Sequence, residues 1–316
     1  MILRLFKSVK AKFLIIIMKI YKQIRYWYKK YTPNFLQKFF TALKPNWVDL
    51  FFHKINSYFY DEESGHGEYK KILEVTELLN IEQKFYLDIG ASDGLSSSCT
   101  FPFAKSDNWE GLSIEYDEKK YSKMKFLYKN FKSASVLKSK ITPNNIEEVL
   151  DENKIPKNLT FLNIDIDSYD LEVVSVLLNS GYKPEIISME INEKIPPPIY
   201  FSVLYDDDHF WIGDHFYGCS ITAANSLLSS FNYGIYELIY NNILFLNKSS
   251  FKKLSFQNVT DAYAKGYVDK PDRKKLFSYN EDVDCLQEMK KNEAINFLNE
   301  YFKKYEGKYD MKIIEE

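Results

Sequence analysis

The sequence predicts an α/β protein built on a mostly parallel β-sheet with helices on both faces. The apolar run KFYLDIG (84–90) is typical of a buried strand that ends at a glycine. From there to residue 192, strand-like and helix-like runs alternate with short links, which is the pattern of parallel strands joined by crossover helices. With 316 residues and 45% hydrophobic content, the chain is long enough for a sizeable core.

Each element follows from its own pattern of apolar residues. Strands are expected at 84–90, 110–117, 133–139, 158–167 and 184–192, followed by an antiparallel pair at 233–240 and 242–248. Helices are expected at 68–80, 117–130, 143–153, 169–181 and 220–231. The segment 193–218 contains three consecutive prolines and is expected to be irregular.

Charge divides the chain into unequal parts. Residues 1–60 contain 12 Lys or Arg and one acid, Asp49, so they carry +11 and the remainder −13. We expect a basic amphipathic helical region (1–60), a main domain (61–250) and a helical C-terminal extension (251–316). The three cysteines form no CxxC pair, which favours a reducing compartment.

The first thirty residues predict an amphipathic helix. Apolar side chains recur every three or four residues, and lysines and arginines gather on the opposite side. The longest apolar run, FLIIIM, is far shorter than the roughly 20 residues that a spanning helix needs. Two interpretations stay open: a helix lying on an anionic membrane surface, or one docked on the protein's own body or on a second copy in a homodimer.

The stretch LDIGASDG (87–94) marks the expected binding edge of the sheet. Ligands of open parallel sheets sit at the carboxyl ends of the strands, and glycines there let the backbone turn tightly. Gly90 and Gly94 frame the turn, and Asp88 and Asp93 bring acids to it. Twenty-one residues past Gly94, Glu115 ends the second strand, where an acid can accept both hydroxyls of a ribose.

These residues resemble class I S-adenosylmethionine-dependent methyltransferases. More narrowly, LNIDIDSYDLEVVSVLL followed by PEIISMEIN resembles the FkbM-like family, as does the closing strand pair FNYGIYELIYNNILFLNK. That family commonly has glycine where this chain has Ser168, and often Glu at the acids that correspond to Asp167 and Asp170. The resemblance covers roughly residues 83–248. It implies a Rossmann-like three-layer sandwich with a seven-stranded, mostly parallel sheet and an antiparallel last strand.

The resemblance also implies a cofactor site. Asp88, Gly90 and Gly94 would surround the methionine part of S-adenosylmethionine, and Glu115 would hold its ribose. The expected cofactor-binding residues are Asp88, Gly90, Ala91, Ser92, Asp93, Gly94, Glu115, Tyr116, Ser139, Lys140 and Asp165.

Oxygen-bearing side chains end the fourth and fifth strands. Asp165 and Asp167 end one strand, and Glu190 and Asn192 end the next. Neighbouring parallel strands bring such residues to one edge, and oxygen ligands suit Mg²⁺ or another divalent cation. Metal-dependent O-methyltransferases of the catechol and macrocin types resemble this arrangement. The alternative is that Asp167 and Asp170 cap the following helix and that Asp165 holds the cofactor's ammonium group.

The loop YDDDHFWIGDHFYG (205–218) supplies candidates for proton transfer. His209 or His215 could accept the proton of a hydroxyl as it is methylated, alongside Asp165 and Asp167 as catalytic acids. The alternative is a solvated acidic loop whose histidines pack on aromatic side chains.

Together these features predict an S-adenosylmethionine-dependent O-methyltransferase. The family resemblance favours a sugar hydroxyl of a polysaccharide, lipopolysaccharide or other glycan. The basic amphipathic N-terminus would fit a cytoplasmic enzyme that is peripheral to the inner face of a membrane. One rival is a nucleic-acid methyltransferase that uses the basic arm, which the −13 remainder disfavours. The other is a non-catalytic membrane adaptor that keeps the fold, and failure to bind the cofactor would favour it.

Overall fold

The computed structural model describes residues 47–60, 64–79, 81 and 84–314, together with seven isolated positions between residues 16 and 31. The predicted amphipathic helix of residues 1–30, with its membrane-binding or docking face, therefore lies largely outside the described residues. The domain boundaries at residues 60 and 250 stay predictions. No helix within the described ranges is both long enough and apolar enough to cross a bilayer.

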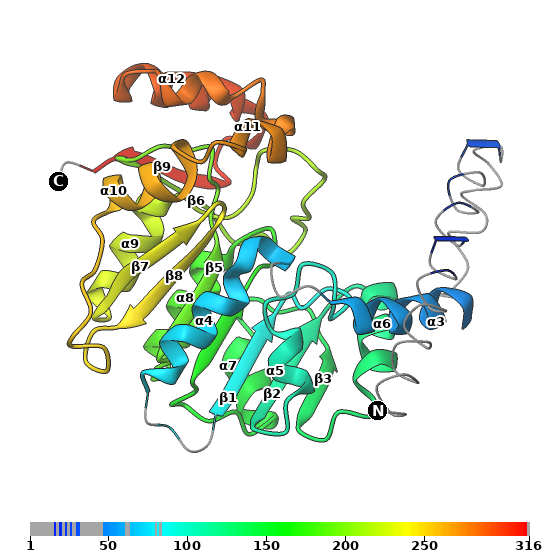
Figure 1. Cartoon of the computed structure of the whole chain (residues 1–316). Helices are drawn as coiled ribbons and strands as arrows, with labels where there is room; N and C mark the ends of the chain where they lie inside the picture. Colours follow the sequence, from blue (N-terminus) through cyan, green and yellow to red (C-terminus); the bar gives the residue numbers. More distant parts are fainter. Residues whose placement is uncertain are drawn as a thin grey trace.

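A seven-stranded sheet forms the centre of the molecule, in the order β3-β2-β1-β4-β5-β8-β7 (Figure 1). Its strands are β1 (Lys84–Ile89), β2 (Trp109–Glu115), β3 (Ala134–Lys138), β4 (Phe161–Ile164), β5 (Ile186–Glu190), β7 (Tyr233–Ile239) and β8 (Asn242–Asn247). Strands β1 to β5 pair in parallel, and β8 is antiparallel to both β5 and β7. This confirms the predicted fold class, since a strand order with an antiparallel last strand inserted beside β5 is that of the Rossmann-like class I methyltransferase fold.

Helices cover both faces of the sheet and complete the three layers. Helices α4 (Glu68–Glu77), α5 (Phe101–Lys105) and α6 (Glu118–Tyr128) pack on one face; α7 (Ile146–Glu152), α8 (Asp170–Asn179) and α9 (Ile221–Ser230) pack on the other. Successive strand residues supply the two cores in turn: Leu87 and Ile89 belong to one, and Tyr86 to the other. The strands are therefore apolar on both faces, as the continuous run in β1 predicted.

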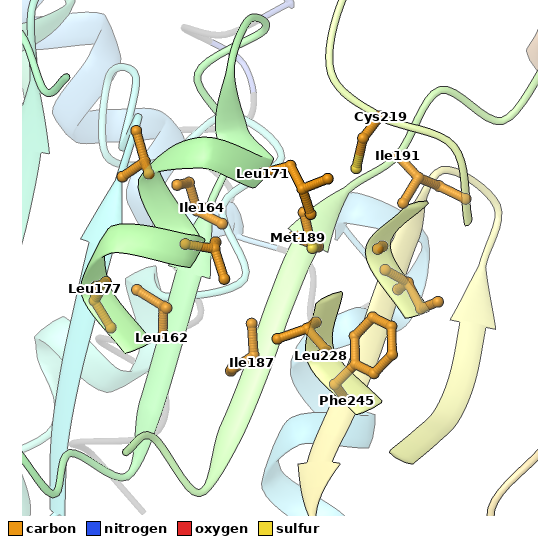
Figure 2. Packing of buried hydrophobic residues seen from close by; sticks show 14 of the residues in the cluster. Leu162, Ile164, Leu171, Leu177, Ile187, Met189, Ile191, Cys219, Leu228 and Phe245 are labelled. Carbon is orange, nitrogen blue, oxygen red and sulfur yellow. The ribbon is translucent and has the colours of Figure 1, made fainter. Parts of the chain in front are cut away.

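The core between the sheet and α8–α9 is shown in Figure 2. Leu162 and Ile164 of β4 lie beside Ile187 and Met189 of β5, and leucines of α8 and α9 cover them. All four strand side chains are fully buried. Full burial of such a side chain contributes about 1.5–3 kcal/mol to folding, so this layer holds the ends of β4 and β5 in fixed positions.

The segment 193–218 is not wholly irregular, and the C-terminal extension is not wholly helical. Strand β6 (Ile199–Val203) pairs antiparallel with β9 (Tyr309–Ile313), so both predictions are wrong at these residues. Local sequence patterns do not reveal this pairing, because prolines precede β6 and its partner strand lies more than 100 residues later in the sequence. The helical part of the extension comprises α10 (Val259–Tyr263), α11 (Arg273–Leu276) and α12 (Lys291–Tyr301), of which α11 and α12 lie above β6 and β9 in Figure 1.

A buried polar network joins the extension to the main sheet. Glu193 and Lys194, just after β5, are 0% and 3% exposed and form an ion pair at 3.2 Å. The Lys194 ammonium group also donates to the Tyr217 hydroxyl at 2.6 Å, and the Asn280 amide donates to Glu193 at 2.7 Å. Because a buried charge is costly without partners, this network fixes the extension against the end of β5.

Candidate active site

A cavity of about 590 Å³ opens at the carboxyl ends of the parallel strands. This size falls within the usual range for small-molecule and cofactor sites. The predicted residues that line it are Asp88, Gly90, Ala91, Ser92, Glu115, Tyr116, Ser139, Lys140, Asp165, Asp167 and His209. The fold thus gathers most of the predicted site residues around one ligand-sized space.

Gly90 lets the end of β1 approach the end of β4. Its φ is +87°, and a Cβ placed on it would lie 1.7 Å from the carbonyl oxygen of Asp165. The amides of Gly90 and Ala91 both donate to the Ile114 carbonyl, at 3.0 and 2.9 Å. The turn therefore ties three neighbouring strand ends together at the floor of the cavity.

Asp88 lies deep beneath this turn and is 2% exposed. Its carboxylate accepts hydrogen bonds from the Thr100 hydroxyl and from the Asn163 amide, the latter at 2.9 Å. Burial raises the pKa of Asp88 to about 6, although both hydrogen bonds act against that shift. The carboxyl is thus oriented, largely dehydrated and without a cationic partner among these contacts.

The stability of the wild-type protein can be compared with that of the Asp88→Asn variant. We expect the difference between their free energies of unfolding, wild type minus variant, to fall as the pH rises from about 4 to about 7. Because the folded-state pKa is raised, the contribution is complete below the unfolded pKa of about 3.9 and is lost as the pH passes through about 6. A shift of about two units corresponds to roughly 3 kcal/mol. Urea unfolding across this pH range measures the difference, and a pH-independent value would contradict it.

Glu115 ends β2 with its side chain against the cavity. One carboxylate oxygen accepts from the Ser92 amide at 2.8 Å, and the other from the Asp117 amide at 2.6 Å. A carboxylate has about four acceptor positions, so two remain for further donors. The position and the free acceptor capacity suit a pair of ribose hydroxyls.

Asp93 and Gly94, which were predicted to bind the cofactor, are not among the residues that line the cavity. The Asp93 carboxylate accepts from the Leu95 and Ser96 amides, and these hydrogen bonds together with His53 lower its pKa although burial acts to raise it. His53, from α3 (Trp47–Asn56), also contacts the Asp93 carbonyl oxygen at 2.9 Å. Gly94 instead faces α6, where a Cβ would lie 2.7 Å from Met124. Both residues stabilise the turn from outside.

The acids that end β4 and β5 come together as predicted. Asp165, Asp167 and Glu190 each offer one oxygen, and these oxygens lie within 4.8 Å of one another. Burial and the neighbouring carboxyl charges raise the pKa values of Asp165 and Glu190 well above the usual range. Three convergent carboxyl oxygens fit a divalent cation such as Mg²⁺, Mn²⁺ or Ca²⁺.

Asn192, the fourth predicted metal ligand, has a different contact. Its amide nitrogen donates to the carbonyl oxygens of His215 and Tyr217, at 2.9 and 3.0 Å, so it holds the backbone of the loop before α9. Its amide oxygen is buried without a hydrogen-bond partner among the described residues. The contacts of Asn192 in the structure are therefore with the loop backbone.

The two histidines of the loop lie in different places: His209 lines the cavity, and His215 does not. His209 lines the cavity, and its Nε2 is buried without a hydrogen-bond partner in the described part of the chain. Burial lowers the pKa of His209, which favours the neutral ring. His215, also predicted as catalytic, instead contacts the Asp282 carboxylate at 3.1 Å and is not among the residues that line the cavity.

Sequence patterns missed several residues of the cavity. The most unusual is Glu68, the first residue of α4, which is 3% exposed. Cys99, Lys120, Asn163 and Asn242 also line the cavity. The one sequence feature that pointed to Glu68 is the preceding SGHG (64–67), whose glycines leave room beside a ligand.

The loop 204–214 brings aromatic side chains to the mouth of the cavity. Phe210 stacks on Tyr116 with ring centroids 6.2 Å apart, and the Lys140 ammonium group lies 5.0 Å from the Phe210 ring centroid. Lys140 also forms an ion pair with Asp207 at 2.8 Å. Phe210, Trp211 and Ile212 nevertheless stay 53%, 45% and 72% exposed, so they present apolar surface to a ligand.

Comparison with known proteins gives structural matches only. No protein-family model matches the chain, and no curated protein matches it. Solved structures similar to it include a SAM-dependent methyltransferase from Aquifex aeolicus, with a TM-score of 0.35 and 14% identity over 60% of this chain and 96% of that one. Precorrin-6y C5,15-methyltransferase from Geobacter metallireducens has a TM-score of 0.32 and 13% identity over 55% of this chain and 84% of that one.

Fibrillarin from Aeropyrum pernix, solved with bound S-adenosyl-L-methionine, is also similar. Its TM-score is 0.35 at 8% identity, over 55% of this chain and 74% of that one. The superpositions are loose, so the assignment of the fold rests on the strand order and pairing of this chain itself.

Proposed function

We propose that the protein is an S-adenosylmethionine-dependent methyltransferase. The observation that carries the proposal is the cavity at the carboxyl ends of β1, β2 and β4, with Glu115 in position for a ribose. Its volume and its mixture of buried carboxyls, serines and aromatic rings suit an adenosine joined to an amino acid.

Calorimetric titration with S-adenosylhomocysteine, with and without Mg²⁺, tests the proposal. Binding in the micromolar range is the expected result, and a heat that depends on Mg²⁺ would support a metal at the strand-end acids. A folded protein that binds nothing in either condition would overturn the methyltransferase assignment and favour the non-catalytic adaptor.

We expect Glu115→Ala to weaken the binding of S-adenosylhomocysteine by about 1–3 kcal/mol, because the ribose hydroxyls lose their buried acceptor. Glu110→Ala is the matched control, since Glu110 lies on the same strand and is exposed. The same titration measures both variants. Equal affinities for the two variants would count against Glu115 as the ribose ligand.

The proposed chemistry is methylation of a hydroxyl group. S-adenosylmethionine would supply an electrophilic methyl group on a positively charged sulfur. Asp165, Asp167 and Glu190 would hold a divalent cation, whose chemistry there would be to lower the pKa of the acceptor hydroxyl. His209, which lines the cavity, would accept the hydroxyl proton. The chain's own contribution is then positioning and charge stabilisation.

The proposed acceptor is a sugar hydroxyl of a glycan, as the FkbM-like resemblance implies. The exposed rings of Tyr116, Phe210 and Trp211 support it, since flat aromatic surfaces beside a cavity suit stacking on sugar rings. An acceptor screen that begins with polysaccharide and lipopolysaccharide fragments tests this point. Methylation of nucleic acid but of no sugar would replace it with the rival acceptor class.

The proposed location is the cytoplasm, at the inner face of a membrane. The +11 charge of residues 1–60 supports attraction to anionic lipid. Sedimentation with anionic and with neutral vesicles tests it, and equal binding to both, or binding to neither, would count against it.

A further inference from the structure

Glu68 is buried at the acidic end of the cavity although it begins a helix. Acids in the first turn of a helix are normally exposed, yet Glu68 is 3% exposed and lines the cavity. Gly67, at φ +87°, is the residue that precedes the first turn of α4. Since burying a carboxyl is costly, its position calls for a compensating partner.

The turn between β7 and β8 orients two acids, Glu68 and Glu190. The Asn242 amide donates to Glu68 at 2.7 Å, and the adjacent Asn241 amide donates to Glu190, also at 2.7 Å. An amide N–H donor favours the ionised, acceptor form of each carboxyl. These contacts hold Glu68 in place and satisfy one of its oxygens, which leaves the other for a ligand.

Among the described residues, no cationic side chain is recorded as acting on Glu68 or Asp88. The charged group that acts most strongly on Glu68 is Asp165, and the one that acts most strongly on Asp88 is Glu115. Burial raises the pKa of Glu68 well above its usual range, and the Asp165 charge adds to this shift. The lysines of the lining, Lys120 and Lys140, follow β2 and β3 on the other side of β1.

We propose that Glu68 binds the α-ammonium group of the methionine part of S-adenosylmethionine, an inference that rests on the proposed function. The ligand's positively charged groups and its ribose would then lie at opposite ends of the cavity. Ammonium and sulfonium charges meet the carboxyls of Glu68, Asp88 and Asp165, while the ribose meets Glu115 across β1. A charge-assisted hydrogen bond is stronger than a hydrogen bond between neutral groups. Glu68 therefore contributes selectivity for the amino acid part of the ligand.

Two ligands separate this role from a merely structural one. S-adenosylhomocysteine carries the amino acid group, and 5′-methylthioadenosine keeps the nucleoside and the thioether but lacks that group. In Glu68→Gln, the amide oxygen still accepts from Asn242, and only the charge is removed. We expect this variant to bind S-adenosylhomocysteine about ten- to hundredfold more weakly, and methylthioadenosine within about twofold of wild type.

Glu77→Gln, an exposed acid on the same helix, is the control and should leave both affinities unchanged. Equal losses for the two ligands, or no loss for either, would overturn the assignment of Glu68, and the unfolding midpoint of each variant reports whether the fold is intact. If wild-type protein binds neither ligand, the proposed function itself fails and this inference fails with it.

Discussion

Replacing Gly90 by alanine is expected to be among the most damaging single substitutions in this chain. The new Cβ would lie 1.7 Å from the Asp165 carbonyl oxygen, and the backbone at φ +87° is strained for any residue with a Cβ. The left-handed conformation costs about 1–2 kcal/mol, and overpacking a filled site costs about 1–3 kcal/mol more. We expect the free energy of unfolding to drop by about 2–5 kcal/mol, together with loss of S-adenosylhomocysteine binding.

Gly181→Ala separates the two causes. Gly181 has nearly the same φ, +86°, but an added Cβ meets nothing within 4 Å. This control should therefore lose only the cost of the backbone conformation and should keep ligand binding. Urea unfolding and calorimetric titration of both variants measure the difference. Similar losses in the two variants would show that β1 and β4 do not approach as closely as the structure has them.

Asp165→Asn is expected to reduce methyl transfer at least about 100-fold while the protein stays folded. Asparagine keeps the shape of the side chain but removes the charge that the proposed cation or the proposed acceptor hydroxyl would require. Because Asp165 lies beside the Asp167 and Glu190 carboxyls and its pKa is raised by burial and by Asp167, loss of its charge removes repulsion at neutral pH. The unfolding midpoint at pH 7 should therefore be unchanged or higher.

Turnover with saturating acceptor, measured together with S-adenosylhomocysteine affinity, tests this expectation. Asp107→Asn, an exposed acid before β2, serves as the surface control. Wild-type turnover in Asp165→Asn would remove this residue from the mechanism. A loss of turnover accompanied by unfolding would show instead that Asp165 is needed for the structure.

Parts of the site that depend on sheet geometry could be predicted from the sequence. Asp165 and Glu190 end neighbouring parallel strands, and the register that pairs Ile164 with Met189 brings them together. Glu115 follows from the same reasoning on β2. Such predictions succeed because strand order and the alternation of side chains leave few positions for a residue at a strand end.

Parts that depend on distant contacts could not be predicted. The histidines at 209 and 215 share one acidic, aromatic loop, and only the packing of the extension places Asp282 beside His215. Glu68 is buried because Asn242, 174 residues away, meets it. Asp93 looked like a ligand residue because of the glycines around it, yet its hydrogen bonds run to the next turn and to α3. No local pattern contains these contacts.

The loop that carries His209 is held by residues near the end of the chain, so it can be fixed in place only late in synthesis. Asp206 pairs with Lys308, 102 residues later, and Asp214 pairs with Lys304 and Tyr305. A growing chain therefore contains this loop roughly 5–20 seconds before it contains the loop's anchors at ordinary rates of synthesis, and it contains the glycine turn and the strand-end acids earlier still. The glycine turn and the strand-end acids can assemble first, and His209, the proposed proton acceptor, is fixed in place only when β9 joins β6.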